Sequence, residues 1–527
     1  MNRIIITVGV LLVAMIAMAY LYFSNLQKNT SANDLSLNFV SANAGLVFGF
    51  NHDKSFYDIL GRQELFQRVL GDTKAGQFAV INKLTSNDQL VDILDGQKIY
   101  IGFVSGASTE IDYLICAQAK QNIESNHISK YVSKDYKITK IDNVFSLYAN
   151  DSVTIYIGIK DNLMVISNAI EQVKKVNSVE GNSTSNFTSY IKQNNGFNKN
   201  TLASLYVNFD ALNPFLKNLI KGEINGELNV FNSKDCYAML NYSFSAEKLL
   251  FNGVTEVGAT DSYYNLFSQL PSQKITIDNL LPAQTANYTV YSVSDYKNWQ
   301  TELSGWLDRQ NKSQQISKNE DIINKKYGLD IKKIFPIYFK NQFVTFQLAS
   351  GEKLGGISLS NGEKVAQLLL DLSAEYAPDI RVFREQNIPY MYFGEPFKKF
   401  EKPFYTIIDN YLVMANHASS IQVFLNSYRN NSLLINNLSY QNFNEQVSDA
   451  TIWFYINNKN SNTILDRNLK APYYKQYKSK DGLGTFEAFS YQLSGDKGKF
   501  LSNLLLFKSP EKSADTLQKQ VLNLDIK

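Results

Sequence analysis

The residue types that most often perform catalysis are sparse in this sequence. It contains 3 histidines, and no two of them have the close spacing of a metal site on one helix or hairpin. We interpret His417 as a solvent-facing residue at a helix start and His52 as a residue at a strand-to-helix junction. The third is His127. The histidines therefore predict no metal centre and no cofactor.

Serine followed three residues later by lysine is another arrangement that can do chemistry, because the lysine can deprotonate the serine. Ser245 with Lys248 and Ser494 with Lys497 match this spacing, but the S-D-N and K-T-G companions of that catalytic class are missing. Both matches lie between strand-like runs, and we interpret them as hairpin turns. Residues 71–77 (GDTKAGQ) have the glycine spacing of a phosphate-binding loop, yet glutamine stands where the lysine is needed. No catalytic residue is predicted.

Bulk composition indicates a folded, sheet-rich protein. The chain has 527 residues, of which 44% are hydrophobic, enough for two to four cores of ordinary size. The 52 Lys and Arg residues nearly balance the 49 Asp and Glu residues, and no basic run could follow a phosphate backbone, which argues against nucleic acid as a partner. The 33 Phe and 32 Tyr residues favour strands.

The first residues form a candidate membrane anchor. After Arg3, the uncharged apolar run from residue 4 to residue 23 covers 20 residues (23 − 4 + 1). A helix of that length, at ~1.5 Å per residue, crosses the ~30 Å hydrocarbon layer. We predict a transmembrane helix within residues 1–25 and an extracytoplasmic location for the rest, periplasmic if the envelope has two membranes. The alternative is a secretory signal, because residues 17–19 (AMA) have the pattern that signal peptidase reads.

The chain has 2 cysteines, Cys116 and Cys236. Both lie in apolar, strand-like contexts, where a free cysteine is commonly a small buried hydrophobe. Export would permit a disulfide between them, and the sequence leaves both alternatives open.

One phrase occurs twice. Residues 161–168 read DNLMVISN and residues 409–416 read DNYLVMAN, 248 positions apart (409 − 161). Hydrophobic residues at helical spacing follow both copies, so each predicts a strand, a tight turn, a second strand and a helix. Asp-Asn pairs favour a turn with left-handed backbone, and asparagine is a favoured N-cap. The predicted turn and cap positions are Asp161, Asn162, Asn168, Asp409, Asn410 and Asn416.

Other stretches match in the same order along the chain. They are residues 43–60 with 286–303, Tyr206 and Asn208 with Tyr455 and Asn457, and 242–251 with 491–500, at spacings of 243, 249 and 249 (286 − 43, 455 − 206, 491 − 242). Nearly constant spacing over four stretches argues against chance. We interpret the chain as a tandem duplication of a unit far longer than a solenoid repeat.

The predicted class is α+β, with two duplicated lobes of mainly antiparallel sheet and peripheral helices behind one transmembrane helix. The sequence predicts strands at residues 97–104, 153–159, 341–348 and 404–408. The predicted divisions are an anchor (1–25), a linker (26–39), a first lobe (40–258), a connection (259–282), a second lobe (283–508) and a tail (509–527).

With one N-terminal helix and a repeated phrase of strand, Asp-Asn, strand and helix, the chain resembles a class of uncharacterised bacterial membrane-anchored envelope proteins. The resemblance implies location and architecture, and it brings no activity with it. The leading hypothesis is a tethered extracytoplasmic protein that binds, without catalysis, a partner protein or an apolar or lipid ligand on exposed sheet surface. The alternatives are an envelope hydrolase, which needs a pocket with two convergent titratable groups, and a structural spacer.

Overall fold

The computed structural model describes most of the chain between residues 34 and 508. The predicted anchor, the glycine-containing stretch at 71–77, His127 and the tail from residue 509 lie outside the described residues. Within the described part, no helix is both long and apolar enough to cross a membrane. The described ranges are 34–52, 92–94, 96–106, 111–123, 137–141, 144–150, 153–178, 185–194, 201–222, 235–245, 247–258, 262–480 and 482–508.

The chain divides into two compact units. Unit 1 comprises Met1–Asp53, Lys83–Val104 and Asp112–Phe197, and unit 2 comprises Lys54–Asn82, Ser105–Ile111 and Asn198–Lys527. Residues 198–258, which we expected in the first lobe, therefore cluster with the second.

Unit 1 is built around an antiparallel sheet with helices α2 (Leu35–Asn43), α8 (Ile170–Lys174) and α9 (Asn186–Asn194). Helix α2 packs tightly on the second strand, because a Cβ added to Gly102 would lie 2.6 Å from Val40 Cγ2 and 2.7 Å from Ala44 Cβ. The strand order is β1 (Leu46–Asn51), β2 (Lys98–Ser105), β3 (Ile111–Gln118), β7 (Leu163–Ser167), β6 (Val153–Lys160), β5 (Val144–Asn150) and β4 (Lys137–Ile141).

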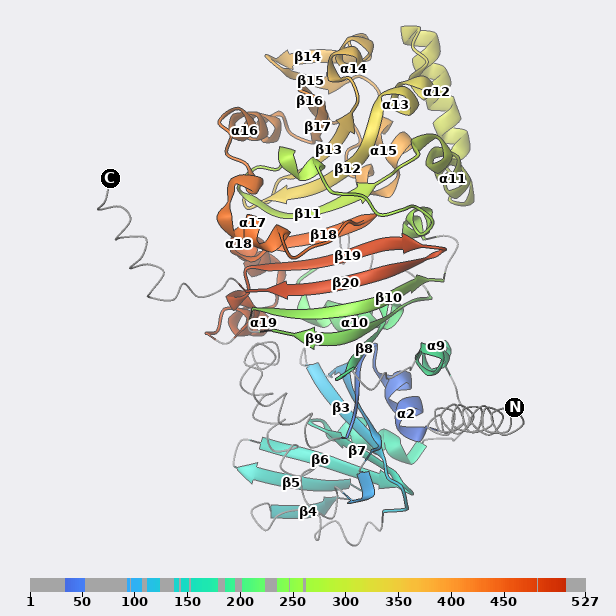
Figure 1. The fold of residues 1–527 in the computed structure, drawn as a ribbon, viewed down its shortest axis with the longest axis vertical. Coiled ribbons are helices and arrows are strands. Elements are labelled where there is room, and N and C mark those ends of the chain that lie inside the picture. The colour runs from blue at the N-terminus through green and yellow to red at the C-terminus, as the bar shows by residue number, and fades with distance from the viewer. Residues whose placement is uncertain are drawn as a thin grey trace, which may run out of the picture. The chain divides into compact units, whose positions relative to one another are not determined.

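Unit 2 contains a longer antiparallel sheet (Figure 1). Its order is β8 (Ser204–Asn208), β9 (Cys236–Phe244), β10 (Lys248–Val257), β20 (Lys499–Phe507), β19 (Ala488–Asp496), β18 (Ile452–Asn457), β11 (Thr285–Ser292), β12 (Phe339–Leu348), β13 (Lys353–Leu359), β17 (Tyr411–Ala415), β16 (Phe404–Ile408), β15 (Ile380–Phe383) and β14 (Ser373–Ala377). The α+β class with antiparallel pairing is thus confirmed.

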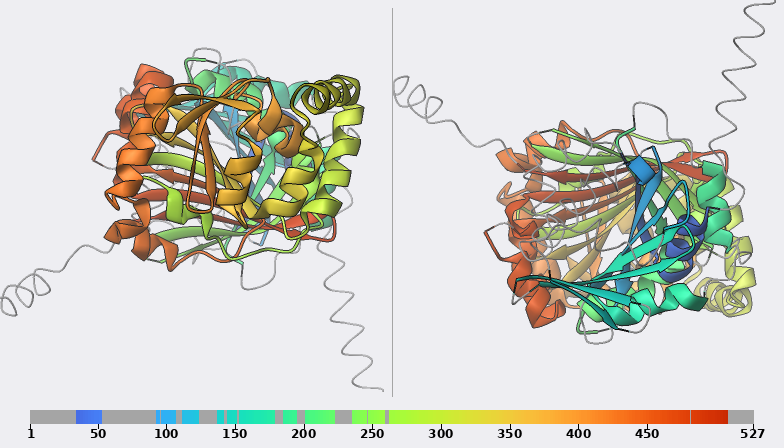
Figure 2. Two further views of the ribbon diagram at one scale, coloured as in Figure 1. Left: turned by 90° about the horizontal axis from the view of Figure 1, so that it is seen from above. Right: turned by 90° about the horizontal axis from the view of Figure 1, so that it is seen from below.

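Helices cover both faces of the strands from β11 to β17. Seen from above (Figure 2), α11 (Tyr296–Arg309), α12 (Ser313–Tyr327) and α13 (Ile334–Tyr338) lie on one side of these strands, opposite α16 (Ala418–Arg429), α17 (Leu438–Asn444) and α18 (Asn458–Asn468). Asparagine and aspartate side chains begin several of them. Asp295 accepts from Asn298 N, and Asn457 accepts from Asn460 N, as N-caps do.

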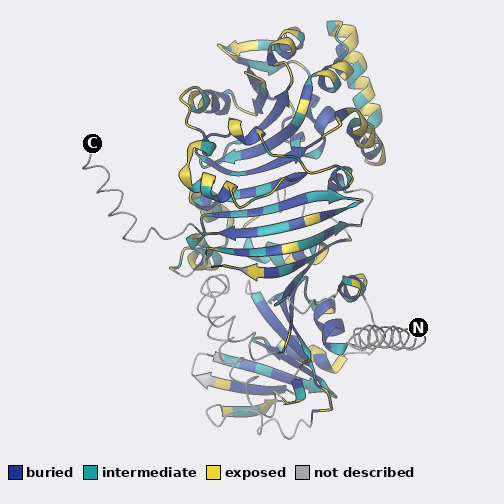
Figure 3. Ribbon diagram, in the orientation of Figure 1, coloured by how far each residue is buried: buried dark blue, intermediate teal, exposed yellow. Residues whose placement is uncertain are grey.

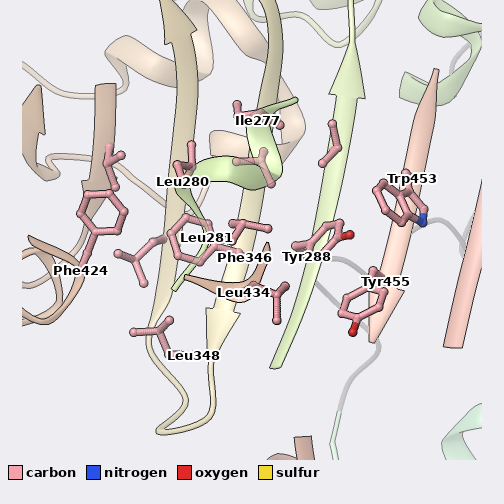
Figure 4. Close-up of a cluster of buried hydrophobic side chains, with 14 of the residues drawn as sticks. Ile277, Leu280, Leu281, Tyr288, Phe346, Leu348, Phe424, Leu434, Trp453 and Tyr455 are labelled. Carbon is pink, nitrogen blue, oxygen red and sulfur yellow. The ribbon is translucent and has the colours of Figure 1, made fainter. Parts of the chain in front are cut away.

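Each covered face has its own core, because alternate residues of β11 point in opposite directions. Tyr288 belongs to an aliphatic and aromatic cluster on one face, together with Trp453 and Phe424 (Figure 4). Tyr291 points the other way and stacks on Phe343, with ring centroids 4.9 Å apart. Burying each such side chain contributes roughly 1.5–3 kcal/mol.

The predicted connection between lobes was 259–282, and its described part, residues 262–282, contributes to both cores. Phe267 is fully buried and lies 5.4 Å from the ring of Tyr291, while Ile277 and Leu280 belong to the opposite cluster. This segment is part of the body of unit 2 because its apolar side chains are spaced to reach the two faces in turn.

The buried helix α15 (Ile388–Phe393) shows how the aromatic core satisfies polar backbone groups. All its residues are buried, so its terminal carbonyls cannot bind water. The Tyr263 hydroxyl donates to Phe393 O at 2.5 Å, and the Tyr296 hydroxyl donates to Tyr392 O at 2.9 Å. The tyrosines thereby replace solvent at the helix end.

The same order of pairing occurs in both halves of the sequence. The series β1, β2, β3, β7, β6, β5, β4 in unit 1 corresponds strand for strand to β11, β12, β13, β17, β16, β15, β14 in unit 2. The series β8, β9, β10 likewise corresponds to β18, β19, β20. The strands predicted at 97–104, 153–159, 341–348 and 404–408 are observed as β2, β6, β12 and β16.

Candidate functional site

The repeated Asp-Asn pair forms a hairpin turn in both places. Asp161, between β6 and β7, has φ 55°, and Asp409, between β16 and β17, has φ 49°, the left-handed backbone expected for these positions. The following asparagines accept backbone hydrogen bonds at their carbonyls: Ala119 N donates to Asn162 O, and Leu359 N donates to Asn410 O, both at 2.8 Å. Each turn therefore binds the main chain at the end of the neighbouring strand, which is β3 in unit 1 and β13 in unit 2.

The predicted helix caps at Asn168 and Asn416 are wrong. The N-cap residues are Ala169 for α8 and His417 for α16, and neither makes a side-chain cap. Each asparagine is engaged elsewhere, since Asn168 Oδ1 accepts from Tyr113 N at 2.9 Å and Asn416 Nδ2 donates to Lys399 O at 2.9 Å. These amides fix other segments to the strand end instead of starting the helix.

The other residues singled out from the sequence have structural positions. Cys116 and Cys236 are buried free thiols, so the disulfide is not formed. Burial raises the pKa of the Cys236 thiol to about 12, which makes it unreactive. His417 is exposed at the start of α16, as predicted. Ser245 N donates to Lys248 O across a hairpin end, which confirms a turn there.

A buried polar network in unit 2 is the strongest candidate for titratable chemistry. The Tyr440 hydroxyl donates to Asp278 Oδ2 at 2.9 Å, and the hydroxyls of Tyr288 and Tyr440 lie 2.8 Å apart. Burial raises the pKa of the Asp278 carboxyl, opposed by the hydrogen bond from Tyr440. Asp278 is 5% exposed and the two tyrosines 1% and 2%. A substrate cannot reach groups so completely covered, and we interpret the network as a core cross-link.

The corresponding carboxylate in unit 1 is partly exposed. Asp34 Oδ1 caps helix α2 by accepting from Leu37 N at 2.9 Å, and its Oδ2 accepts from the Tyr100 hydroxyl at 3.2 Å. Burial lowers the pKa of nearby Lys98 to about 8, opposed by the negative charge of Asp34. Among the described residues, no group of three or more His, Cys, Asp or Glu side chains is placed to hold a metal ion.

An exposed sheet surface emerges from the pairing of β9, β10 and β20. Alternate residues on these strands are buried, among them Leu240, Phe251 and Ser502. Between them lie residues that are exposed or half-buried (Figure 3). We call this surface the central face. It comprises Tyr237, Met239 and Asn241 of β9, Asn252 and Val254 of β10, and Leu501 and Asn503 of β20.

Cross-strand register arranges the central face in rows. Met239, Val254 and Leu501 form an apolar row, and Leu501 is 52% exposed. The adjacent row carries the amides of Asn241, Asn252 and Asn503 and continues to Gln492 of β19. A sheet surface with aliphatic and amide side chains in neighbouring rows can pack against apolar groups while it hydrogen bonds to peptide groups.

Two of these four side-chain amides are already hydrogen-bonded, and the other two bind no residue that the structure describes. Asn241 Oδ1 accepts from Ser204 Oγ at 2.9 Å, and Gln492 Nε2 donates to Ser448 O at 2.6 Å. The side chains of Asn252 and Asn503, which lie directly opposite each other, bind no other residue that the structure describes. Burial, reinforced by the charge of Asp235, raises the pKa of Tyr237, whose side chain hydrogen bonds to Asp235.

Sequence reasoning did not find the central face, although a signal was present. The runs KLLFNGVTEV and KFLSNLLLF begin the two strands with a lysine, and the spacing between those lysines is 251 (499 − 248), not the 249 taken from the sequence match. At the spacing of 251, Asn252 corresponds to Asn503. The sequence alone does not reveal the importance of this correspondence, because only the strand pairing shows that these two residues are neighbours.

No protein-family model and no curated protein matches the chain. Among solved structures, crystal form IV of TP0453 is similar with a TM-score of 0.24 and 12% identity, covering 43% of this chain and 81% of that chain. Crystal form I of TP0453 gives a TM-score of 0.24 and 10% identity, covering 46% and 81%. Likeness at this level carries no argument about function.

Proposed function

We propose that this chain is a membrane-tethered extracytoplasmic protein that binds a partner protein of a bacterial cell envelope through the central face. The apolar run from residue 4 to residue 23 supports the tether. The observation that carries the binding role is the half-exposed Leu501 beside the amides of Asn252 and Asn503, which bind no other described residue.

The partner that fits best is a protein surface. Protein interfaces are about as apolar as the rest of a protein surface, with polar groups that form hydrogen bonds across the contact. Leu501, Val254 and Met239 supply an apolar row, and Asn252 and Asn503 supply donors and acceptors beside it. An acyl chain would leave those amides without partners, which costs about 1–3 kcal/mol for each buried group.

We also propose that the two halves arose by tandem duplication. Matching strand order supports this, and so do two contacts in which corresponding residues meet. Asn252 pairs with Asn503, and Ile220 pairs with Leu469. Around the second pair, Lys221 N donates to Asn468 O at 2.7 Å and Lys470 N donates to Leu219 O at 2.9 Å, a reciprocal pattern at a spacing of 249 (470 − 221). A local twofold relation between closing segments is what a fused dimer would retain.

The binding role is tested by carrying a photo-reactive side chain at position 252 in cells that make the full chain. We expect one protein to be cross-linked reproducibly and then identified by mass spectrometry. Leu501→Asp should reduce its yield at least tenfold, because a charge would enter the centre of the contact. The matched control is Ile337→Asp, a position 59% exposed on α13 and outside the central face.

Three outcomes decide the proposal. Loss of the cross-link in Leu501→Asp with retention in Ile337→Asp supports it. Equal yields in both variants, or cross-linking to lipid alone, would overturn it. Thermal melting of the purified variants checks that both remain folded, as expected for substitutions at half-exposed positions.

A further inference from the structure

In each unit the sheet ends in a strand that, among the strands that the structure describes, is paired along one side. Strand β4 pairs with β5 and strand β14 pairs with β15, and neither has a second neighbour among the strands that the structure describes. The two strands hold the same place in the corresponding strand orders. An edge strand leaves a row of backbone N–H and C=O groups free to pair with another strand.

The edge formed by β4 is basic. Its sequence is KITKI, and both Lys137 and Lys140 are exposed. Lys140 Nζ lies 5.6 Å from the ring centroid of Phe145, its neighbour on β5. Ile141, the last residue of β4, is 42% exposed. Two positive charges and an apolar side chain therefore lie along five residues of free strand.

The edge formed by β14 is acidic. Its sequence is SAEYA, with Glu375 exposed and Tyr376 62% exposed. The exposed carboxylates of Asp371 and Asp379 flank it, although Asp379 also pairs with Arg429 at 2.6 Å. The neighbouring Arg381 turns inward, since its Nε donates to Ser373 Oγ at 2.8 Å and its Nη2 to Leu370 O at 3.2 Å.

Charges on edge strands usually prevent pairing between sheets. Here the two edges carry opposite signs, so repulsion opposes β4 with β4 and β14 with β14, while β4 with β14 is attractive. We propose that β4 of one molecule pairs in the antiparallel direction with β14 of a second copy of this chain, placing Lys140 opposite Glu375. The partner of each edge is thus the unlike edge of another copy.

The same kind of junction already exists within unit 2, where β10 and β20 join two three-stranded segments edge to edge. A contact between unlike surfaces does not close on itself in a dimer, and repetition gives an open chain of molecules. Five paired residues extend only ~17 Å, so the contact is weaker than a standard interface and favoured by high local concentration. This proposal is independent of binding at the central face.

The test is sedimentation velocity of the full chain in detergent over a series of concentrations. The wild-type chain should self-associate, and added salt should weaken the association. Lys140→Glu gives two acidic edges and Glu375→Lys gives two basic edges, so each variant alone should associate at least tenfold more weakly. Lys297→Glu, an exposed position on α11, is the control for change of charge and should behave as wild type.

Charge exchange separates this contact from any other route to self-association. A 1:1 mixture of the Lys140→Glu and Glu375→Lys chains should associate again, and so should the chain carrying both substitutions, because unlike edges are restored. A wild-type chain that stays monomeric throughout the series overturns the proposal. It is equally overturned if the single variants associate normally, or if neither the mixture nor the double variant recovers.

Discussion

The two units show how one residue on a strand decides what can lie above it. In unit 1, Val47 pairs with Gly102, and helix α2 occupies the space that a side chain at position 102 would need. In unit 2 the corresponding pair is Val290 with Val344. There the preceding segment is the short 3-10 turn η5 (Ile277–Leu280), not a helix of nine residues. Two sheets with the same strand order can therefore be covered by different segments, a helix in unit 1 and a 3-10 turn in unit 2.

A second difference concerns the carboxylate that precedes the first strand. The carboxylate oxygens of Asp34 accept hydrogen bonds from Leu37 N at the start of α2 and from the Tyr100 hydroxyl. In unit 2 there is no such helix to cap, and Asp278 is buried against Tyr440. A solvent-accessible cap and a buried carboxyl differ in their response to pH, which gives the comparison a measurable consequence.

The largest expected effect comes from truncating a corresponding pair of core residues. Phe343→Ala should lower the free energy of unfolding of unit 2 by about 4 kcal/mol, because it removes the ring that stacks on Tyr291. Ile101→Ala, the corresponding change in unit 1, should cost about 3 kcal/mol. Native-state hydrogen exchange measures both, with protection lost in β11 to β13 for the first variant and in β1 to β3 for the second.

These two variants serve as controls for each other. Each unit has its own core, so β5 and β6 should keep their protection in Phe343→Ala. Equal loss of protection throughout the chain in either variant would contradict two separate cores.

An intermediate effect is expected from Asp278→Asn and depends on pH. Burial holds the pKa of Asp278 above its unfolded value of about 3.9, so the folded protein keeps this proton after the unfolded chain has released it. The free energy of unfolding should therefore fall as pH rises from about 4 through the raised pKa, and then level off. The variant has no carboxyl to ionise at this position, so its free energy of unfolding should not fall in this way. At pH 8 we expect Asp278→Asn to be more stable than wild type by about 1 kcal/mol.

Chemical denaturation at pH 4 and pH 8 checks this expectation. The comparison variant is Tyr440→Phe, which removes the hydrogen bond that stabilises the carboxylate and should destabilise the protein most at pH 8. If Asp278→Asn were destabilising at pH 8, ionised Asp278 would be a net stabilising group and the interpretation would fail.

The smallest effect distinguishes the two Asp-Asn turns. Glycine adopts left-handed backbone without the penalty of a Cβ, so Asp161→Gly should stabilise unit 1 by about 0.5 kcal/mol. At the other turn, Asp409 Oδ2 accepts from the Tyr428 hydroxyl at 2.8 Å, and Asp409→Gly loses that bond. We expect a net change near zero there, measured by urea denaturation.

In a Tyr428→Phe background, the hydrogen bond is already absent. Asp409→Gly should then stabilise unit 2 about as much as Asp161→Gly stabilises unit 1. A persistent difference between the two substitutions would show that Tyr428 is not its source.

Local patterns predicted much of this fold. The sequence predicted the strands at 97–104 and 404–408, the Asp-Asn turns and the exposed His417. Each of these features depends on a few neighbouring residues. Asn457 also matched Asn208 in the sequence, and both residues cap helices with their side chains. Short-range geometry determines such features, so a repeat in the sequence identifies them twice.

Features that depend on distant partners were missed. Asn168 has the right residue type for a cap, but Asp112 and Tyr113, more than fifty positions earlier, engage its amide. The central face depends on the register between β10 and β20, whose paired residues lie 251 positions apart at Asn252 and Asn503 (503 − 252). Neither contact leaves a periodic trace in the sequence.

The seam between β10 and β20 is formed by main-chain groups, from Lys248 opposite Phe507 to Thr255 opposite Phe500. Every amino acid except proline carries both of those groups. Outward-facing side chains along this line can therefore be exchanged through evolutionary drift while the main-chain hydrogen bonds stay in place, and new recognition surfaces can arise within unit 2 at little risk to its folding.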